Sequence, residues 1–160
     1  MPKRYQQPPE TVIDPAHRYE ATISTDKGDI VLALDPSRAP KTVNNFVFLA
    51  REGFYDGLTF HRVVPDFVVQ AGCPAGNGTG NPGYRFEDEP VQGEYIAGAV
   101  AMANSGPNSN GSQFFICSID DRHKLAKSYN LFGQVIKGMD VVGQVKVGDV
   151  MRSVTVREAD

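Results

Sequence analysis

Three polar side chains interrupt apolar stretches of this sequence and are the first candidates for chemistry: Arg62, Gln70 and Gln113. Arginine is rarely buried without a partner, so Arg62 within an apolar run indicates a fixed cation beside hydrophobic surface. A site made of a guanidinium group, two amides and aromatic rings contains no group that exchanges a proton near neutral pH. Such a site can bind and polarise a ligand. This favours either a binding module or an enzyme whose reaction breaks no bond.

The stretch around Arg62 and Gln70 is predicted to be a β-hairpin, because apolar residues lie on both sides of a Pro-Asp turn signal. With a three-residue loop over 65–67, Arg62 faces Gln70 across the strands on one face of the sheet. A two-residue loop would put Gln70 on the opposite face, since a shift of one residue reverses the side chains. We prefer the longer loop, because it gives the arginine a polar neighbour. His61 is then expected on the face opposite Arg62, as a hydrogen-bonded packing residue.

Composition and charge narrow the function classes. The chain has 160 residues, of which 41% are hydrophobic and 22% charged, as in a single soluble globular domain. A net charge of -3 argues against a nucleic-acid binder. No apolar run approaches the roughly 18 residues of a membrane span, so no membrane partner is expected. The N-terminus lacks the apolar segment of a signal peptide, and a cytoplasmic location is therefore the default expectation.

Histidine and cysteine usage indicates neither a metal site nor a nucleophile. None of the three histidines stands at ligand spacing from another, and the cysteines do not pair with them. No serine lies in a nucleophile-elbow pattern. The two cysteines, Cys73 and Cys117, lie far apart in the sequence and fit reduced thiols. We therefore expect no metal and no other cofactor.

The elements that must position these residues are short strands with frequent turns. A polar, proline-rich segment, 1–18, is predicted to be a flexible tail before one domain, 19–160. Helices are predicted over 39–51 and 138–145, and strands over 19–25, 29–34, the two arms of the hairpin, 95–103, 112–118, 129–136 and 151–157. Many short strands without helical connections favour a sandwich or a barrel and argue against a parallel sheet.

A series of short motifs extends in order from Tyr19 to Glu158, nearly the whole chain. They are Phe60-His61-Arg62, Phe67, Gln70-Ala71-Gly72, Phe86-Glu87-Asp88-Glu89, Met102-Ala103-Asn104, Gly106-Pro107, Asn110-Gly111-Ser112-Gln113-Phe114-Phe115-Ile116 and Phe132-Gly133. In these motifs the chain resembles the cyclophilins, which are peptidyl-prolyl cis-trans isomerases. The resemblance implies a mainly β fold, a closed eight-stranded antiparallel β-barrel capped by two α-helices. It also implies a substrate groove on the outer face of the barrel, and a monomer.

The resemblance further implies roles for ten residues. Arg62 would bind the twisted X-Pro bond of the transition state, and Gln70 would hold Arg62 in place. An apolar pocket would receive the proline ring, and Asn104 and Gln113 would bind the substrate backbone. The expected catalytic set is Arg62, Phe67, Gln70 and Phe115, and the expected substrate-binding set is Val68, Ala103, Asn104, Gln113, Leu125 and Tyr129.

The chain departs from the family at the rim of the expected pocket. Lys124 stands where tryptophan is common, Tyr129 where histidine is common, and Val68 where methionine is frequent. The rim loop is also about one residue longer than is usual in the family. These changes predict weak binding of cyclosporin-like inhibitors. The retained catalytic set predicts an isomerase that assists folding by acting on proline-containing polypeptides, and the alternative is a non-catalytic module that binds proline segments.

Overall fold

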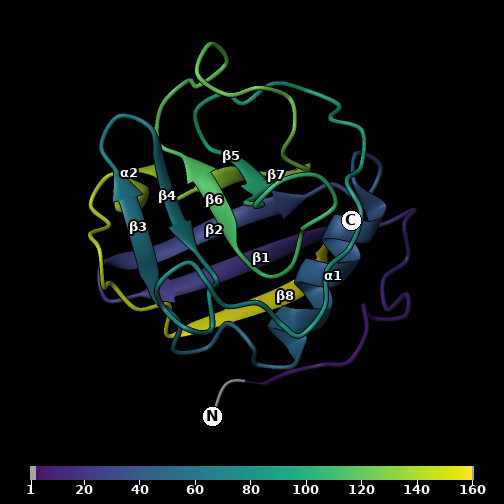
Figure 1. Cartoon of the computed structure of the whole chain (residues 1–160). Coiled ribbons are helices and arrows are strands. Elements are labelled where there is room, and N and C mark those ends of the chain that lie inside the picture. The colour runs from purple at the N-terminus through teal and green to yellow at the C-terminus, as the bar shows by residue number, and fades with distance from the viewer. Residues whose placement is uncertain (1–2, 160) are drawn as a thin grey trace.

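A computed structural model describes residues 3–159 of the chain, and Figure 1 shows their arrangement. This part of the chain forms, in order, β1 (Arg18–Thr25), β2 (Gly28–Leu34), α1 (Pro40–Arg51), β3 (Phe60–Val64), β4 (Val68–Ala71), β5 (Ala99–Met102), β6 (Phe114–Cys117), β7 (Leu131–Lys137), α2 (Met139–Val142) and β8 (Ser153–Ala159). Every strand pairs antiparallel with its neighbours in one sheet, in the order β3-β4-β6-β5-β7-β2-β1-β8. Neither helix is long and apolar enough to cross a membrane.

The sheet curls so that β3, β4 and β6 cross in front of β1 and β2, with β8 below them in the view (Figure 1). Its two outer strands, β3 and β8, share no ladder in the described part of the chain. They approach each other through the segments that precede them, where Thr59 bridges Val150 and the Phe60 amide donates to the Asp149 carbonyl at 2.8 Å. The expected mainly β, eight-stranded antiparallel fold with two helices is confirmed. The expected closure of the barrel is not confirmed, because the sheet forms a curled half-barrel.

Hydrophobic side chains form one cluster on the inner face of the sheet and a second on its outer face. The inner core contains a fully buried ring cluster in which Phe46 of α1 lies 5.1 to 5.5 Å from Tyr55, Phe114 and Phe132. A smaller cluster on the outer face contains Val68, Tyr95, Ala99, Ala101, Phe115, Cys117 and Leu131. Phe114 and Phe115 are adjacent in β6 and therefore point to opposite faces. This alternation assigns Phe114 to the core and leaves Phe115 for the outer surface.

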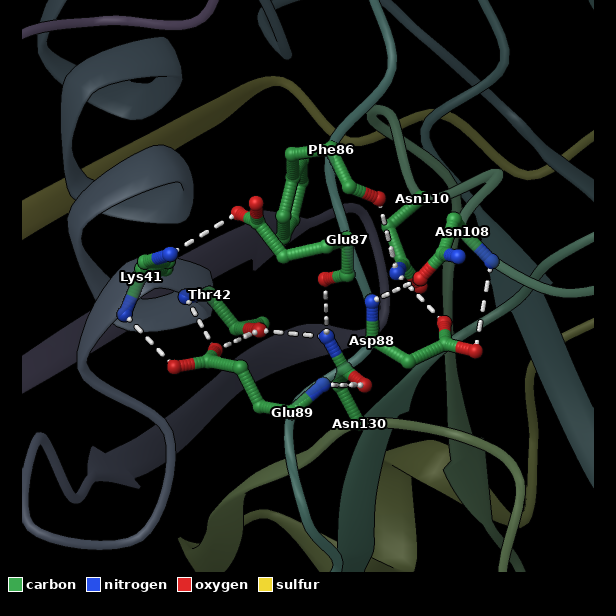
Figure 2. A network of polar contacts seen from close by, with 9 residues as sticks. All are labelled: Lys41, Thr42, Phe86, Glu87, Asp88, Glu89, Asn108, Asn110 and Asn130. Carbon is green, nitrogen blue, oxygen red and sulfur yellow. Dashed lines mark hydrogen bonds and ion pairs between the residues drawn. The ribbon is translucent and has the colours of Figure 1, made fainter.

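Helix α1 begins at Pro40, a residue that suits the first turn because its missing N–H would be unpaired there. The preceding residue, Ala39, has no side chain that could cap the helix. The Glu89 carboxylate takes that role from a distant loop. It accepts hydrogen bonds from the Lys41 and Thr42 amides at 3.0 and 2.8 Å and from the Thr42 hydroxyl at 2.6 Å (Figure 2). Glu89 thereby ties this loop to the helix that closes the core.

The N-terminal segment lies against α1. The Tyr5 amide donates to the Pro82 carbonyl at 2.8 Å, and the Tyr5 ring packs edge-on against Phe48 at 5.1 Å. Farther along, the Asn44 side-chain oxygen accepts from the amides of Val12 and Ile13 at 2.7 and 3.2 Å. These contacts place the segment on the domain surface. Its predicted flexibility, and the domain boundary after residue 18, stay predictions.

Candidate active site

The hairpin formed by β3 and β4 has the predicted register. Arg62 pairs with Gln70, and Val64 pairs with Val68, so three residues form the loop. The middle one, Asp66, has φ 55°, a left-handed conformation that aspartate tolerates better than most residues. The three-residue loop is therefore confirmed over the two-residue alternative. It places the guanidinium and the first amide on one face of the sheet.

A chain of side-chain hydrogen bonds, the amide relay, begins at Arg62. Its Nη1 donates to Gln70 Oε1 at 3.2 Å, and Gln70 Nε2 donates to Gln113 Oε1 at 3.1 Å. Gln113 Nε2 in turn donates to the carbonyls of Gly78 and Gly80 at 3.0 and 3.1 Å. Because carbonyl oxygens only accept, the amide of Gln113 has one possible orientation, and it sets that of Gln70. The relay therefore presents an acceptor to Arg62 and holds one end of its guanidinium.

The remainder of the guanidinium is open to a ligand. Arg62 is exposed, and within residues 3–159 it forms no salt bridge with a carboxylate. An arginine carries five N–H donors, of which the relay uses one. Arg62 thus offers a positive charge and several donors beside the adjoining apolar surface.

A small cavity of about 220 Å³, which we call the apolar cavity, adjoins Arg62. Its lining comprises Arg62, Phe67, Val68, Gln70, Ala103, Asn104, Phe115, Leu125 and Tyr129. These are nine of the ten residues expected from the resemblance, and the tenth, Gln113, belongs to the relay through Gln70. Strands β3, β4 and β6, the turn between β3 and β4, and the segments after β5 and β6 supply them. The structure thus brings the whole set together, while the role of each residue stays a prediction.

The rim of the apolar cavity is held by an aromatic pair and a lysine. The Tyr129 ring meets Phe115 edge-on at 5.5 Å. The Tyr95 hydroxyl donates to the Tyr129 carbonyl at 2.6 Å and accepts from its amide at 3.1 Å. Burial raises the pKa of Tyr95 to about 12, so this hydroxyl keeps its proton at neutral pH. On the other side, Lys124 Nζ donates to the Asp66 carbonyl at 2.8 Å and joins the rim loop to the hairpin turn.

Asn104 uses its side chain within the protein. Its Nδ2 donates to the Ser128 carbonyl at 2.9 Å, and its Oδ1 accepts from the Gly106 amide at 3.2 Å. In the described part of the chain, neither backbone group of Asn104 has a hydrogen-bond partner. The groups that Asn104 can offer to a bound peptide are therefore its main-chain N–H and C=O.

A second, more polar cavity of about 370 Å³ continues from the first and shares Arg62, Gln70, Ala103 and Asn104 with it. We call it the polar cavity. Its other walls come from His61, from the loop 77–85 and from the segment 105–113. The two cavities form one groove across the outer face of the sheet, with Arg62 at their junction.

Comparison with known proteins identifies the family. A family model described as cyclophilin type peptidyl-prolyl cis-trans isomerase/CLD matches residues 20–159. The chain belongs to this family. A peptidyl-prolyl cis-trans isomerase of Helicobacter pylori is 43% identical over 158 residues, covering 89% of this chain and 96% of the relative. Peptidyl-prolyl cis-trans isomerase B of Bacillus subtilis is 48% identical over 133 residues, covering 82% and 92%.

A solved structure supports the same assignment. The cyclophilin type isomerase of Cryptosporidium parvum superposes with a TM-score of 0.81 at 28% identity, covering 90% of this chain and 100% of that one. The predicted family and its isomerase activity are therefore confirmed. The groove described above belongs to a cyclophilin-type peptidyl-prolyl cis-trans isomerase.

One residue of this cyclophilin lies on a different side from that expected. Phe60 pairs with Ala71 and Arg62 with Gln70, so a β-bulge leaves His61 without a residue opposite. His61 consequently lines the polar cavity together with Arg62, and its expected place on the opposite face was wrong. Its ring nitrogens are buried and form no hydrogen bond of standard geometry within residues 3–159, so the expected hydrogen-bonded packing stays a prediction. Burial lowers the pKa of His61, and the Arg62 charge lowers it further, although the Gln113 side chain lies close enough to raise this pKa slightly.

The remaining candidate ligands and nucleophiles lie apart from the groove or inside the protein. Cys73 and Cys117 are buried free thiols. Residues 3–159 contain no group of three or more His, Cys, Asp or Glu side chains that could hold a metal ion. Besides the imidazole of His61, the groove therefore offers guanidinium groups, amides, backbone groups and apolar walls.

Proposed function

We propose that the apolar cavity receives the proline ring of an X-Pro segment while Arg62 binds the twisted form of its peptide bond. Rotation about this bond is slow because amide resonance sets a barrier of about 18–20 kcal/mol. Resonance occupies the lone pair of the proline nitrogen in both planar isomers. In the twisted transition state that lone pair is localised and can accept a hydrogen bond. A donor fixed at this place stabilises the transition state more than either ground state, which is the condition for catalysis.

The observation that carries the proposal is the junction of the apolar cavity with an arginine held by the amide relay. Phe67, Phe115 and Leu125 give the cavity walls suited to a proline ring. The relay holds Arg62 before substrate arrives, so little ordering is left for the moment of rotation. Rotation about the bond transfers no proton, so this mechanism needs no acid-base pair.

The substrate backbone pairs with Asn104 in this proposal. Its unpaired main-chain N–H and C=O lie where the two cavities meet, and a peptide in extended conformation can satisfy both. The Gln113 side chain keeps one lone pair of Oε1 for a direct contact, since both its amide hydrogens are used. In keeping with a proline-containing ligand, the Cryptosporidium parvum relative has a crystal structure in the presence of the dipeptide Ala-Pro.

The proposal extends to the shape of the barrel, to inhibitor binding and to the partners of the protein. The bridge between Thr59 and Val150 supports closure of the half-barrel into a full barrel. Lys124 at the rim, where an aromatic side chain would add apolar contact, supports weak binding of cyclosporin-like inhibitors. The family resemblance favours a monomer that acts on proline-containing polypeptides, and a cytoplasmic location stays the default expectation. The net charge and the lack of a long apolar run argue against nucleic-acid and membrane partners.

The substitution Arg62→Ala tests the proposed mechanism. A hydrogen bond from a charged donor contributes about 1.5–3 kcal/mol, and if it forms only in the transition state its loss lowers kcat/KM roughly 10- to 150-fold. The assay couples isomerisation of a proline peptide to a protease that cleaves only the trans form. Arg157→Ala removes the same charge from β8 at a residue that lines neither cavity of the groove, and it should retain full activity.

Two outcomes would contradict the proposal. Undiminished turnover by folded Arg62→Ala would remove the assigned role of the guanidinium. A wild-type rate equal to the uncatalysed rate, with peptide still bound, would instead favour the alternative of a non-catalytic module for proline segments. Peptide binding is measured separately by NMR titration, so the two outcomes are distinguishable.

A further inference from the structure

One side of the groove is a loop that depends on a residue outside the groove. The segment 103–112 contributes Ala103, Asn104, Ser105, Ser109, Gly111 and Ser112 to the polar cavity, and the first two of these also line the apolar cavity. Between Met102 and Phe114 this segment forms no regular strand or helix. Its shape must therefore come from specific contacts rather than from a ladder.

Asp88 supplies three such contacts (Figure 2). Its backbone amide donates to Asn108 Oδ1 at 2.9 Å, and its Oδ2 accepts from the Asn108 amide at 3.2 Å. Its Oδ1 accepts from Asn110 Nδ2 at 2.9 Å. One exposed aspartate thus fixes two residues of the segment 103–112, which we call the groove loop, from twenty or more positions away in the sequence.

The two residues that Asp88 holds are those where the loop is most constrained. Asn108 has φ 55°, a left-handed conformation that is unfavourable for most side chains. Asn110 is fully buried, and its Nδ2 is shared between Asp88 and the Phe86 carbonyl at 3.1 Å. Buried amide hydrogens without an acceptor are costly, so the carboxylate of Asp88 stabilises this particular path of the loop.

Hydrogen bonds of Ser109, the residue after Asn108, link this region to the part of the loop that lines the groove. The neighbouring Ser109 hydroxyl accepts from the Ser105 amide at 2.8 Å and donates to the Gly106 carbonyl at 2.7 Å. The Gly106 amide then donates to Asn104 Oδ1 at 3.2 Å. Asp88 itself lines neither cavity. It can therefore act on substrate through the position of this loop, and of Asn104 in particular.

We propose that Asp88 is a positioning residue that sets the peptide affinity of the groove by holding the loop 104–110 in its binding conformation. This inference rests on the proposed function, because it takes the backbone of Asn104 as the group that binds the peptide. It assigns Asp88 to substrate binding and leaves rotation of the bound X-Pro bond to Arg62. Loss of Asp88 should thus weaken binding while leaving turnover of the bound peptide unchanged.

The substitution Asp88→Asn tests this assignment at constant size. Both carboxylate oxygens accept hydrogen bonds, from Asn108 and from Asn110, so an amide can satisfy only one of these donors. One lost hydrogen bond lowers the stability of this loop conformation by about 1 kcal/mol, so peptide affinity should fall by up to about fivefold. The dissociation constant comes from an NMR titration with an Ala-Pro peptide, and turnover comes from the cis-trans exchange rate at saturating peptide. Faster hydrogen exchange at the Ser105 and Gly106 amides is expected alongside.

The matched control is Glu87→Gln. It removes the same charge one residue earlier, but the Glu87 carboxylate pairs with Lys41 at 3.1 Å. Within residues 3–159 it forms no hydrogen bond or ion pair with the loop 103–112. Its dissociation constant and turnover should equal those of the wild type. A second variant, Asn108→Gly, keeps the left-handed conformation accessible and removes the acceptor for the Asp88 amide. It should weaken peptide binding in the same direction, and it provides the test if Asp88→Asn fails to fold.

The results separate the two levels of the proposal. An unchanged dissociation constant in folded Asp88→Asn, or a loss of turnover without loss of affinity, would overturn the positioning role alone. Full activity of Arg62→Ala, measured in the same series, would instead overturn the proposed function. A parallel weakening in Glu87→Gln would assign the effect to surface charge and would also overturn the positioning role.

Discussion

Gln70→Leu should lower the isomerase efficiency of this cyclophilin about tenfold without unfolding it. Gln70 accepts from Arg62 at 3.2 Å, and leucine has a similar volume but no acceptor. The guanidinium would keep its charge and lose its anchor. A hydrogen bond to a charged group contributes about 1.5–3 kcal/mol, and the exposure of Arg62 places this one near the lower end. About 1.4 kcal/mol corresponds to a factor of ten in kcat/KM.

The protease-coupled assay on a proline peptide measures this loss, with Gln134→Leu as the matched control. Gln134 is a half-buried glutamine of β7 that donates to the Ala97 carbonyl at 2.9 Å and lines neither groove cavity. Removing its amide should leave kcat/KM within about twofold of the wild type. Circular dichroism and thermal unfolding of both variants establish that each is folded at the assay temperature.

A double-mutant cycle with Arg62→Ala decides whether Gln70 acts through the arginine. If it does, adding Gln70→Leu to Arg62→Ala should change kcat/KM by less than about twofold, because the coupled pair is already broken. A further tenfold loss in that background would show that Gln70 contributes by another route. Undiminished activity of Gln70→Leu alone would refute the relay altogether.

Two further predictions concern the loop that caps α1 and the bulged histidine. Glu89→Gln should destabilise the protein by about 1–2 kcal/mol in urea unfolding, because the carboxylate accepts from the Lys41 and Thr42 amides at the N-terminus of α1. His61→Gln should reduce the loss of stability in acid. Burial and the charge of Arg62 lower the pKa of His61, so below the unfolded value of about 6.5 the unfolded chain takes up a proton that the folded protein resists.

These predictions have clear contrary outcomes. Equal urea midpoints for wild type and Glu89→Gln would mean that the carboxylate does not cap the helix in solution. The contribution of neutral His61 to the free energy of unfolding is fully present above about pH 6.5. It decreases as the pH falls toward the lowered pKa of His61 in the folded protein. Stability is therefore compared at pH 7.5 and at pH 5.5. The same decrease in wild type and His61→Gln would assign the acid sensitivity to other groups.

The parts of the site that depend on local pattern could be predicted from the sequence. The register of β3 and β4 had only two candidates, and the polar match of Arg62 with Gln70 selected the observed one. The alternation in β6 separated Phe114, in the core, from Phe115, in the groove. Helix α1 was expected within one residue of its observed bounds. In each of these the deciding contacts lie within a few residues or follow directly from strand periodicity.

The parts that depend on distant contacts could not be predicted. A bulge adds one residue without a sequence signal, and it turned His61 to the groove. Strand β5 is shorter than the expected 95–103, because Gly98 at φ 85° ends a turn before Ala99. The role of Asp88 was not foreseen either, since its partners lie twenty or more residues away. Its acidic neighbours give no pattern that would distinguish it.

The filled interior of the half-barrel decides how a polypeptide can reach the site. The rings of Phe46, Tyr55, Phe114 and Phe132 occupy the inside of the curled sheet, and the groove lies on its outer face. A proline-containing peptide that binds in this groove therefore does not need to thread a free end into the protein. The same contacts serve rotation in both directions. The enzyme raises the rate at which the cis and trans isomers interconvert. The folding of the substrate itself determines which isomer is populated.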